Sequence, residues 1–342
     1  MSRSLRLLPL LAPLLLLAGC DGAGVQSVLD PAGPQADRID IVWRLMLWVC
    51  GAFYLMVLGF LAVAVLRHRR RRRAEGEPPE PHPGREGGLR AALAGWVGLI
   101  ALGLLTLIAA SYVVDRRLAH ASGKQGLNVQ VTAHQWWWEV EYLDEDPSKR
   151  FKTANELRLP AGVPVRIELR SSDVIHSFWV PNLHGKLDLI PGRANEIHLI
   201  PERTGRFRGQ CAEFCGLQHA HMAFDVTVEE RGAFEAWRAH QVTTAAEPAT
   251  ELARKGREHF ETSHCAMCHA IRGTKAAGSV APDLTHLAGR ATIAAGALPN
   301  TRGNLAAWIA DPQGIKPGSR MPFIGLEPDE LDALTAYLET LR

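Results

Sequence analysis

The sequence predicts a multidomain membrane protein: a two-helix transmembrane hairpin, an all-β domain and an all-α domain. Two apolar segments, residues 39–66 and 89–114, are each long enough to cross a bilayer. Short β-rich segments, separated by turns that contain Gly and Pro, run from Gly126 to about Glu229. From Glu251 onward the segments have helical patterns, which indicates a separate small α domain.

Composition narrows the possible classes of function. Of the 342 residues, 47% are hydrophobic and 22% are charged, so the chain is neither disordered nor membrane-embedded throughout. The net charge of +2 gives no case for a nucleic-acid partner, which requires a strong basic field. Six cysteines are few for a disulfide scaffold of this length, but four of them form two closely spaced pairs.

The first 19 residues have the features of an export signal. Arg3 and Arg6 precede an apolar stretch, residues 7–17, that is too short to span a membrane. The following Leu-Ala-Gly-Cys resembles a bacterial lipobox, so Cys20 is expected to be the lipidated first residue of the mature protein. Ordinary signal cleavage nearby is the alternative.

The loop between the two apolar segments sets the orientation of the hairpin, which we assign to residues 20–122. Residues 67–73 are six arginines and one histidine, and the positive-inside rule places such a run in the cytoplasm. Both ends of the hairpin are then outside, and everything after about Asp115 is extracytoplasmic. We therefore expect a bacterial inner-membrane protein with its folded domains on the periplasmic face.

A cluster of metal-binding side chains lies in the β domain. Cys211, Cys215, His219 and Met222 have the spacing C-x3-C-x3-H-x2-M, and thiolate, imidazole and thioether together suit copper. Two bridging thiolates can hold two copper ions that share one electron. A second copper then needs another histidine, and His176, at a predicted strand start, is the candidate. The alternative is a structural disulfide, because thiols without a cofactor tend to pair in the periplasm.

Three segments, AHQWWW, SSDVIHSFWVP and CAEFCGLQHAHM, resemble the binuclear copper (CuA) domain of cytochrome c oxidase subunit II, a cupredoxin-like sandwich. The resemblance implies that one copper is held by His176, both cysteine sulfurs and Met222. It implies that the other is held by His219, both sulfurs and the main-chain carbonyl of Glu213. The Glu213 side chain would also reach a magnesium ion at the interface with the catalytic subunit. His221 is off the family's spacing and is expected at the surface.

The run Trp136, Trp137 and Trp138 indicates that at least one of these side chains has a role other than core packing. On a strand, Trp136 and Trp138 would point to one face and Trp137 to the other. Core packing accounts for aromatic side chains on one face only. The resemblance implies that Trp136 is the residue where electrons enter, whereas the other two serve packing or docking.

The α domain carries a haem-attachment motif. Cys265, Cys268 and His269 form C-x-x-C-H, in which the thiols become haem thioethers and the histidine the proximal iron ligand. Without the histidine, C-x-x-C could be a redox dithiol or half of a zinc site. Met321 precedes a proline in a late loop, as in class I cytochromes c, and is the expected sixth ligand; His286 is the alternative. The C-terminal helix is expected to pack on the helix that opens this domain.

The order of these parts resembles subunit II of caa3-type oxidases. It comprises a signal (1–19), the hairpin, a copper domain (123–242) and a cytochrome c domain (243–342). The resemblance implies electron flow from a cytochrome c or bc1-type donor through haem c and copper to a separate subunit I, beside subunit III. The resemblance also implies that oxygen is reduced to water on subunit I and that protons are pumped.

Other functions remain possible at this point. They are the copper subunit of a nitric oxide reductase and a membrane-tethered copper and haem carrier or sensor. Nitrous oxide reductase lacks such a hairpin, and quinol oxidase subunit II lacks the copper ligands. In the family an acidic residue near the start of the second span serves a proton channel, and Glu86 is the nearest candidate.

Overall fold

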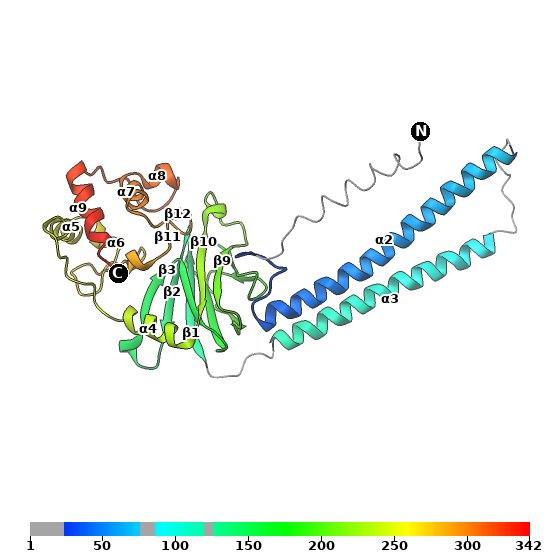
Figure 1. Ribbon diagram of the computed structural model, residues 1–342, viewed down its shortest axis with the longest axis horizontal. Helices are drawn as coiled ribbons and strands as arrows, with labels where there is room; N and C mark the ends of the chain where they lie inside the picture. Colours follow the sequence, from blue (N-terminus) through cyan, green and yellow to red (C-terminus); the bar gives the residue numbers. More distant parts are fainter. Residues whose placement is uncertain (1–23, 76–85, 120–125) are drawn as a thin grey trace, which may run out of the picture. The chain divides into compact units, whose positions relative to one another are not determined.

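The computed structural model describes residues 24–75, 86–119 and 126–342, so the predicted signal and Cys20 lie outside the described residues. The described residues within 37–121 form one compact unit, and all the others form a second. The first unit is the hairpin. The second contains the β domain and the C-terminal helical domain. Figure 1 shows the helices and strands of both units.

The hairpin consists of two long helices, α2 (Pro34–Glu75) and α3 (Glu86–Ala119). Both are long and apolar enough to cross a membrane, and they contain the predicted spans and extend beyond them at each end. Large apolar side chains point outward along them, such as Trp48 and Phe60, which are 79% and 78% exposed. Such a surface suits lipid rather than water. Glu86 is the first residue of α3 and pairs with Arg90 at 3.2 Å.

The β domain is a sandwich of two five-stranded sheets, with strand orders β3-β2-β1-β5-β8 and β4-β10-β9-β6-β7. The strands are β1 (Leu127–His134), β2 (Trp137–Leu143), β3 (Phe151–Ala154), β4 (Glu156–Pro160), β5 (Val165–Ser171), β6 (His176–Trp179), β7 (Leu187–Leu189), β8 (Asn195–Leu199), β9 (Gly205–Cys211) and β10 (Ala223–Glu229). Helix α4 (Arg231–Gln241) follows. The cupredoxin-like sandwich predicted from the sequence is confirmed.

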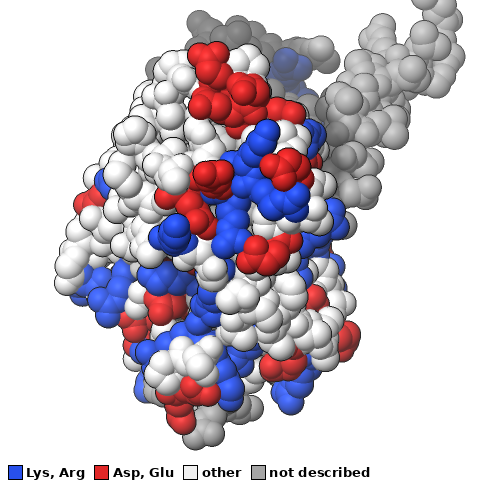
Figure 2. Space-filling view, turned by 90° about the vertical axis from the view of Figure 1, so that its left-hand side faces the viewer, with Lys and Arg blue, Asp and Glu red and all other residues white. Residues whose placement is uncertain are grey.

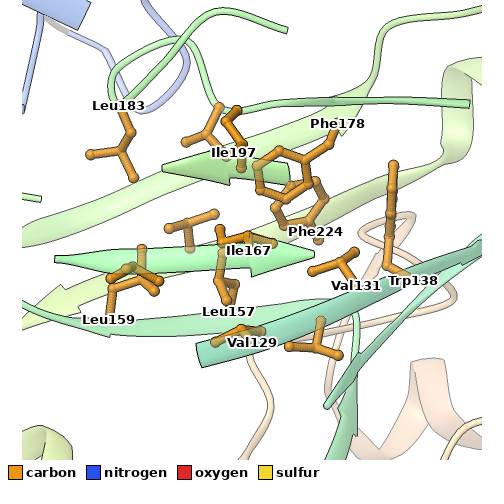
Figure 3. Packing of buried hydrophobic residues seen from close by; sticks show 14 of the residues in the cluster. Val129, Val131, Trp138, Leu157, Leu159, Ile167, Phe178, Leu183, Ile197 and Phe224 are labelled. Atoms are coloured by element: carbon orange, nitrogen blue, oxygen red, sulfur yellow. The ribbon is translucent and has the colours of Figure 1, made fainter. Parts of the chain in front are cut away.

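Alternating apolar residues build the core between the sheets. In β1, Val129 and Val131 are fully buried while the residues between them are not, which is the period of two expected for a strand with one face inward. They meet side chains of both sheets, such as Ile167, Leu157 and Phe224 (Figure 3). The same core includes both cysteines of the predicted copper loop, so packing fixes that loop.

A strap formed by residues 24–36 packs on the β domain, a contact that sequence reasoning missed. Its centre is Asn182, which is fully buried. The Asn182 amide donates to the carbonyls of Gly24 and Asp30 at 3.1 and 2.8 Å and accepts from the Ser27 amide at 3.2 Å. One side chain thus satisfies three backbone groups of the strap.

We expect Asn182→Ala to release this strap and destabilise the β domain by about 3 kcal/mol, because three partly buried hydrogen bonds to the strap are lost together. Denaturant unfolding of the intact chain measures the loss, and amide hydrogen exchange of residues 24–36 locates it. Asn128→Ala, at an exposed position on β1, is the matched control. Equal stability and equal exchange for the two variants would contradict this role of Asn182.

The C-terminal domain, here called the haem domain, is helical apart from a short pair of strands. It comprises α5 (Glu251–Thr262), α6 (Cys265–Cys268), β11 (Thr292–Ile293), β12 (Leu298–Pro299), α7 (Arg302–Ala310), α8 (Pro312–Ile315) and α9 (Pro328–Leu338). Helix α9 packs on α5, as predicted. The crossing is close at Gly256, where a Cβ atom would lie 1.9 Å from the Ala333 carbonyl oxygen. Glycine is therefore required there.

Charges of both signs cover the end of the molecule that carries the haem domain (Figure 2). Ion pairs of the haem domain include Arg302 with both Asp332 and Glu339, and Arg257 with Glu261 at 2.8 Å. Exposed pairs of this kind contribute little to stability.

Candidate copper and haem centres

The predicted copper loop joins two neighbouring strands at one end of the sandwich. Cys211 is the last residue of β9, and Met222 immediately precedes β10. His176 is the first residue of β6, as predicted, and β6 pairs with β9 so that Phe178 lies opposite Cys211. The sheet therefore brings His176 beside a loop that follows it by 35 residues.

All six candidate copper-binding residues meet around the two sulfurs, which are 3.7 Å apart. Around Cys211 Sγ lie His176 Nδ1 at 3.8 Å and the Glu213 carbonyl oxygen at 3.2 Å. Around Cys215 Sγ lie the other two groups, His219 Nδ1 at 3.5 Å and Met222 Sδ at 3.8 Å. His176, both cysteines and Met222 are almost completely buried.

The sulfurs are arranged for a metal rather than for a disulfide. Their separation greatly exceeds the bond length of about 2.05 Å. The hydrogen bond that the two sulfurs share lowers the pKa of Cys211 well below its usual range. The same bond, together with burial, raises the pKa of Cys215. Two neighbouring thiolates repel each other, so a bound cation would favour ionisation of both cysteines. Two thiolates, two imidazoles and a thioether suit copper.

Asp173 orients the first histidine, a role that the sequence analysis did not assign. Its carboxylate oxygen lies 2.8 Å from His176 Nε2, which leaves Nδ1 facing Cys211. Burial opposes ionisation of Asp173, but hydrogen bonds from His176 and from two backbone amides lower its pKa. Carboxylates commonly hold metal-binding histidines in this way. The position of Asp173, three residues before His176, was the available signal.

Trp136 does not lie on a strand, so the prediction that it shares a face with Trp138 was wrong. It occupies the tight turn between β1 and β2, where strand alternation does not apply. Its indole Nε1 donates to the Cys215 carbonyl at 2.9 Å, which ties the ring directly to the copper loop. Trp138 is fully buried in the core, and Trp137 stacks on His134 with ring centroids 4.2 Å apart.

The two histidines of the loop allow a direct test. His219 faces Cys215, whereas His221 is exposed and its Nδ1 lies 2.8 Å from the Gln218 side-chain oxygen. We expect His219→Ala to lower copper content and remove the copper spectrum, and His221→Ala to retain both. Metal analysis and electron paramagnetic resonance (EPR) of the intact chain distinguish the two variants. A larger loss of copper in His221→Ala than in His219→Ala would contradict the assignment of His219 as the ligand.

The C-x-x-C-H segment lies on a single helical turn directly after α5. His269 Nδ1 donates to the Pro282 carbonyl at 2.7 Å, which fixes the tautomer and leaves Nε2 free for a metal. Burial lowers the pKa of His269, which keeps the ring neutral. A loop packs tightly over this turn, because a Cβ atom on Gly278 would lie 2.4 Å from the backbone of Cys268. The geometry suits a histidine that ligates iron.

Met321 lies in the loop between α8 and α9. The Gln313 side-chain amide organises this loop by donating to the carbonyls of Met321 and Ser319 at 2.7 and 2.8 Å. His286, the alternative sixth ligand, is held elsewhere: its Nδ1 lies 2.8 Å from the Arg342 carbonyl and its ring packs on His240 of α4.

The haem domain contacts the copper loop and the adjacent Trp136. The sequence did not predict this contact. The Gln218 amide donates to the Pro317 carbonyl at 2.8 Å, and Lys316 Nζ donates to the Trp136 carbonyl at 2.7 Å. No periodicity or motif marks these residues. The two candidate centres therefore belong to one packed unit.

Comparison with known proteins finds matches to both the β domain and the C-terminal helical domain. Residues 143–229 match the family described as cytochrome c oxidase subunit II, periplasmic domain, and residues 253–342 match the cytochrome c family. The chain is similar to cytochrome c oxidase subunit 2 of Alkalihalophilus pseudofirmus, with 34% identity over 98% of this chain and 97% of that protein. Its similarity to the protein of the same description from Bacillus subtilis is 31% over 98% of each. The solved periplasmic domain of subunit II of cytochrome oxidase of Bradyrhizobium japonicum is 32% identical, covers 35% of this chain and 95% of its own, and has a TM-score of 0.33.

Proposed function

Because the chain belongs to the cytochrome c oxidase subunit 2 family, we propose that it is the subunit through which electrons enter a proton-pumping terminal oxidase. Electrons would pass from a cytochrome c or bc1-type donor through haem c and the copper pair to subunit I, where oxygen is reduced to water. Subunit III would complete the assembly. The observation that carries the proposal is the meeting of six copper-binding groups within one buried site.

The copper site would be shared by two ions. His176, both cysteines and Met222 would hold one, and His219, both cysteines and the Glu213 carbonyl would hold the other. Each histidine faces a different sulfur, which supports two separate copper positions. Bound there, the copper pair would accept and release one electron. His176, both cysteines and Met222 are almost completely buried, which would limit the access of solvent to the copper pair. The half-buried Glu213 side chain would reach a magnesium ion at the interface with subunit I.

The haem would be attached covalently through Cys265 and Cys268, with His269 and Met321 as axial ligands. The neutral His269 ring with its free Nε2 supports the first axial role, and the ordered loop around Met321 supports the second. Trp136 would connect the donor side to the copper pair, since its indole contacts the Cys215 carbonyl.

The hairpin would anchor both centres at the outer face of a bacterial inner membrane. The exposed apolar surfaces of α2 and α3 support this location, and residues 67–73 would lie in the cytoplasm. Lipidation of Cys20 would add a second anchor. The acidic Glu86 at the start of α3 remains the candidate for a proton-channel role.

The test is spectroscopy on the intact chain, purified in detergent after maturation with copper and haem. We expect a multi-line, mixed-valence copper EPR signal together with the optical spectrum of a low-spin Met/His haem. A haem spectrum without that copper signal would contradict the proposal and favour a membrane-tethered cytochrome instead. In the assembled complex, consumption of oxygen rather than nitric oxide with reduced cytochrome c distinguishes an oxidase from a nitric oxide reductase.

A further inference from the structure

Lys316 is a buried cation at the contact between the haem domain and the β domain, which carries the copper loop and is called the copper domain below. It follows α8, and only 3% of the residue is exposed. Its Nζ donates to the Trp136 carbonyl at 2.7 Å, the His221 carbonyl at 2.8 Å and the Ala294 carbonyl at 2.9 Å. The first two acceptors belong to the copper domain and the third to the haem domain. One side chain therefore joins both domains.

The hydrogen bonds of Lys316 require its charged form. An ammonium group has three donors, and each meets one of the three carbonyls. Burial opposes the charge and lowers the pKa of Lys316 to about 7. In the described part of the chain, no carboxylate lies within salt-bridge distance of Nζ. The nearby Cys215 sulfur favours the charge, but a buried cation without a carboxylate partner is costly, so stability alone does not explain a lysine at this position.

The residues after Lys316 continue the contact toward both centres. The Pro317 carbonyl accepts from Gln218 of the copper loop, and a Cβ atom on Gly318 would lie 3.6 Å from the Trp136 ring. Arg320 pairs with Asp173 at 3.3 Å, and that carboxylate also holds His176. Segment 316–321, which ends at the proposed iron ligand Met321, thus lies against the tryptophan that contacts the copper loop.

We propose that Lys316 is a positioning residue that holds segment 316–321 against Trp136, and that this docked arrangement sets the rate of electron transfer from haem c to the copper pair. The inference rests on the proposed function. The step moves one electron: the ferrous haem is oxidised to the ferric state, and the copper pair is reduced by one electron, with no proton transferred. Lys316 touches neither cofactor and acts through the geometry of the contact.

The test compares Lys316→Met with Lys275→Met in the intact chain that carries both cofactors. Methionine keeps the apolar length of the lysine but offers no donor, and Lys275 is an exposed lysine of the same domain. We expect Lys316→Met to keep both spectra while the rate after photochemical reduction of the haem falls by at least about tenfold, equivalent to about 1.4 kcal/mol. Amide hydrogen exchange in residues 134–138 and 292–296 should rise. Lys275→Met should change neither quantity.

Lys316→Gln is a second variant, to be used if Lys316→Met does not incorporate both cofactors. Its uncharged amide can still donate, so we expect a rate and an exchange pattern between those of the wild type and Lys316→Met. Wild-type rate and wild-type exchange in either variant would overturn the positioning role. Absence of the copper signal from the wild-type chain would instead refute the proposed function. The exchange comparison would still report whether Lys316 holds the two domains together.

Discussion

Replacing Cys215 by serine is expected to abolish the mixed-valence copper signal of the intact chain and to leave the haem spectrum unchanged. Cys215 Sγ lies within 3.8 Å of Cys211 Sγ, His219 Nδ1 and Met222 Sδ, so its loss removes a thiolate proposed to be shared by both copper ions. Changing only an outer partner of a metal ligand commonly weakens binding 10–100-fold, so loss of a bridging ligand should lower copper affinity by more than about 100-fold. Oxygen consumption by the complex should fall in parallel.

Two variants calibrate this result. Cys50→Ser changes an exposed thiol within α2 and should leave both spectra intact. Met222→Leu keeps the buried volume but removes the thioether, so we expect a perturbed copper signal rather than its complete loss. Copper content and EPR are the measurements. A normal copper signal in Cys215→Ser would refute the proposed ligand set, and loss of haem in either variant would contradict the expectation that these changes affect copper alone.

Replacing Met321 by leucine is expected to have the opposite effect, changing the haem and preserving the copper signal. A Met/His pair raises the haem potential into the range of electron carriers, so removing the thioether should lower it by on the order of 0.1 V or more. Each fall of about 59 mV makes reduction of the haem by an external donor tenfold less favourable. Optical spectra should lose their low-spin Met/His character, and a redox titration measures the shift.

Met267→Leu is the matched control for this variant. Met267 lies between the two haem cysteines but is 64% exposed, so the same substitution there should leave the spectrum and the potential unchanged. A shift in Met267→Leu with none in Met321→Leu would reverse the assignment. If neither variant shifts the potential, His286→Ala becomes the decisive variant.

Much of the architecture could be predicted because its signals are local. The two long apolar segments and the arginine run between them indicated α2 and α3. Alternating apolar residues indicated the strands of the sandwich. The loop from Cys211 to Met222 and the C-x-x-C-H turn hold most of their chemistry within a dozen residues. Ligand type and spacing therefore pointed to copper and haem before any tertiary structure was known.

Predictions that assumed regular geometry were weaker. Strand alternation was applied across the whole tryptophan run, yet a turn interrupts it at Trp136 and directs the indole to the Cys215 carbonyl. The strap was assigned with the hairpin because it precedes the first apolar segment, although Asn182 binds it to the β domain. Turns and polar anchors depend on partners that sequence patterns do not reveal.

The sequence by itself determined which elements form and which side chains are able to bind copper and haem, since both follow from neighbouring residues. Only the tertiary structure decided how the two centres face each other. Lys316 and Trp136 are 180 residues apart, and their hydrogen bond exists because the fold brings a lysine ammonium to a backbone carbonyl. Every residue has a backbone carbonyl, so no pattern in the chain distinguishes the carbonyls that will accept from a buried cation.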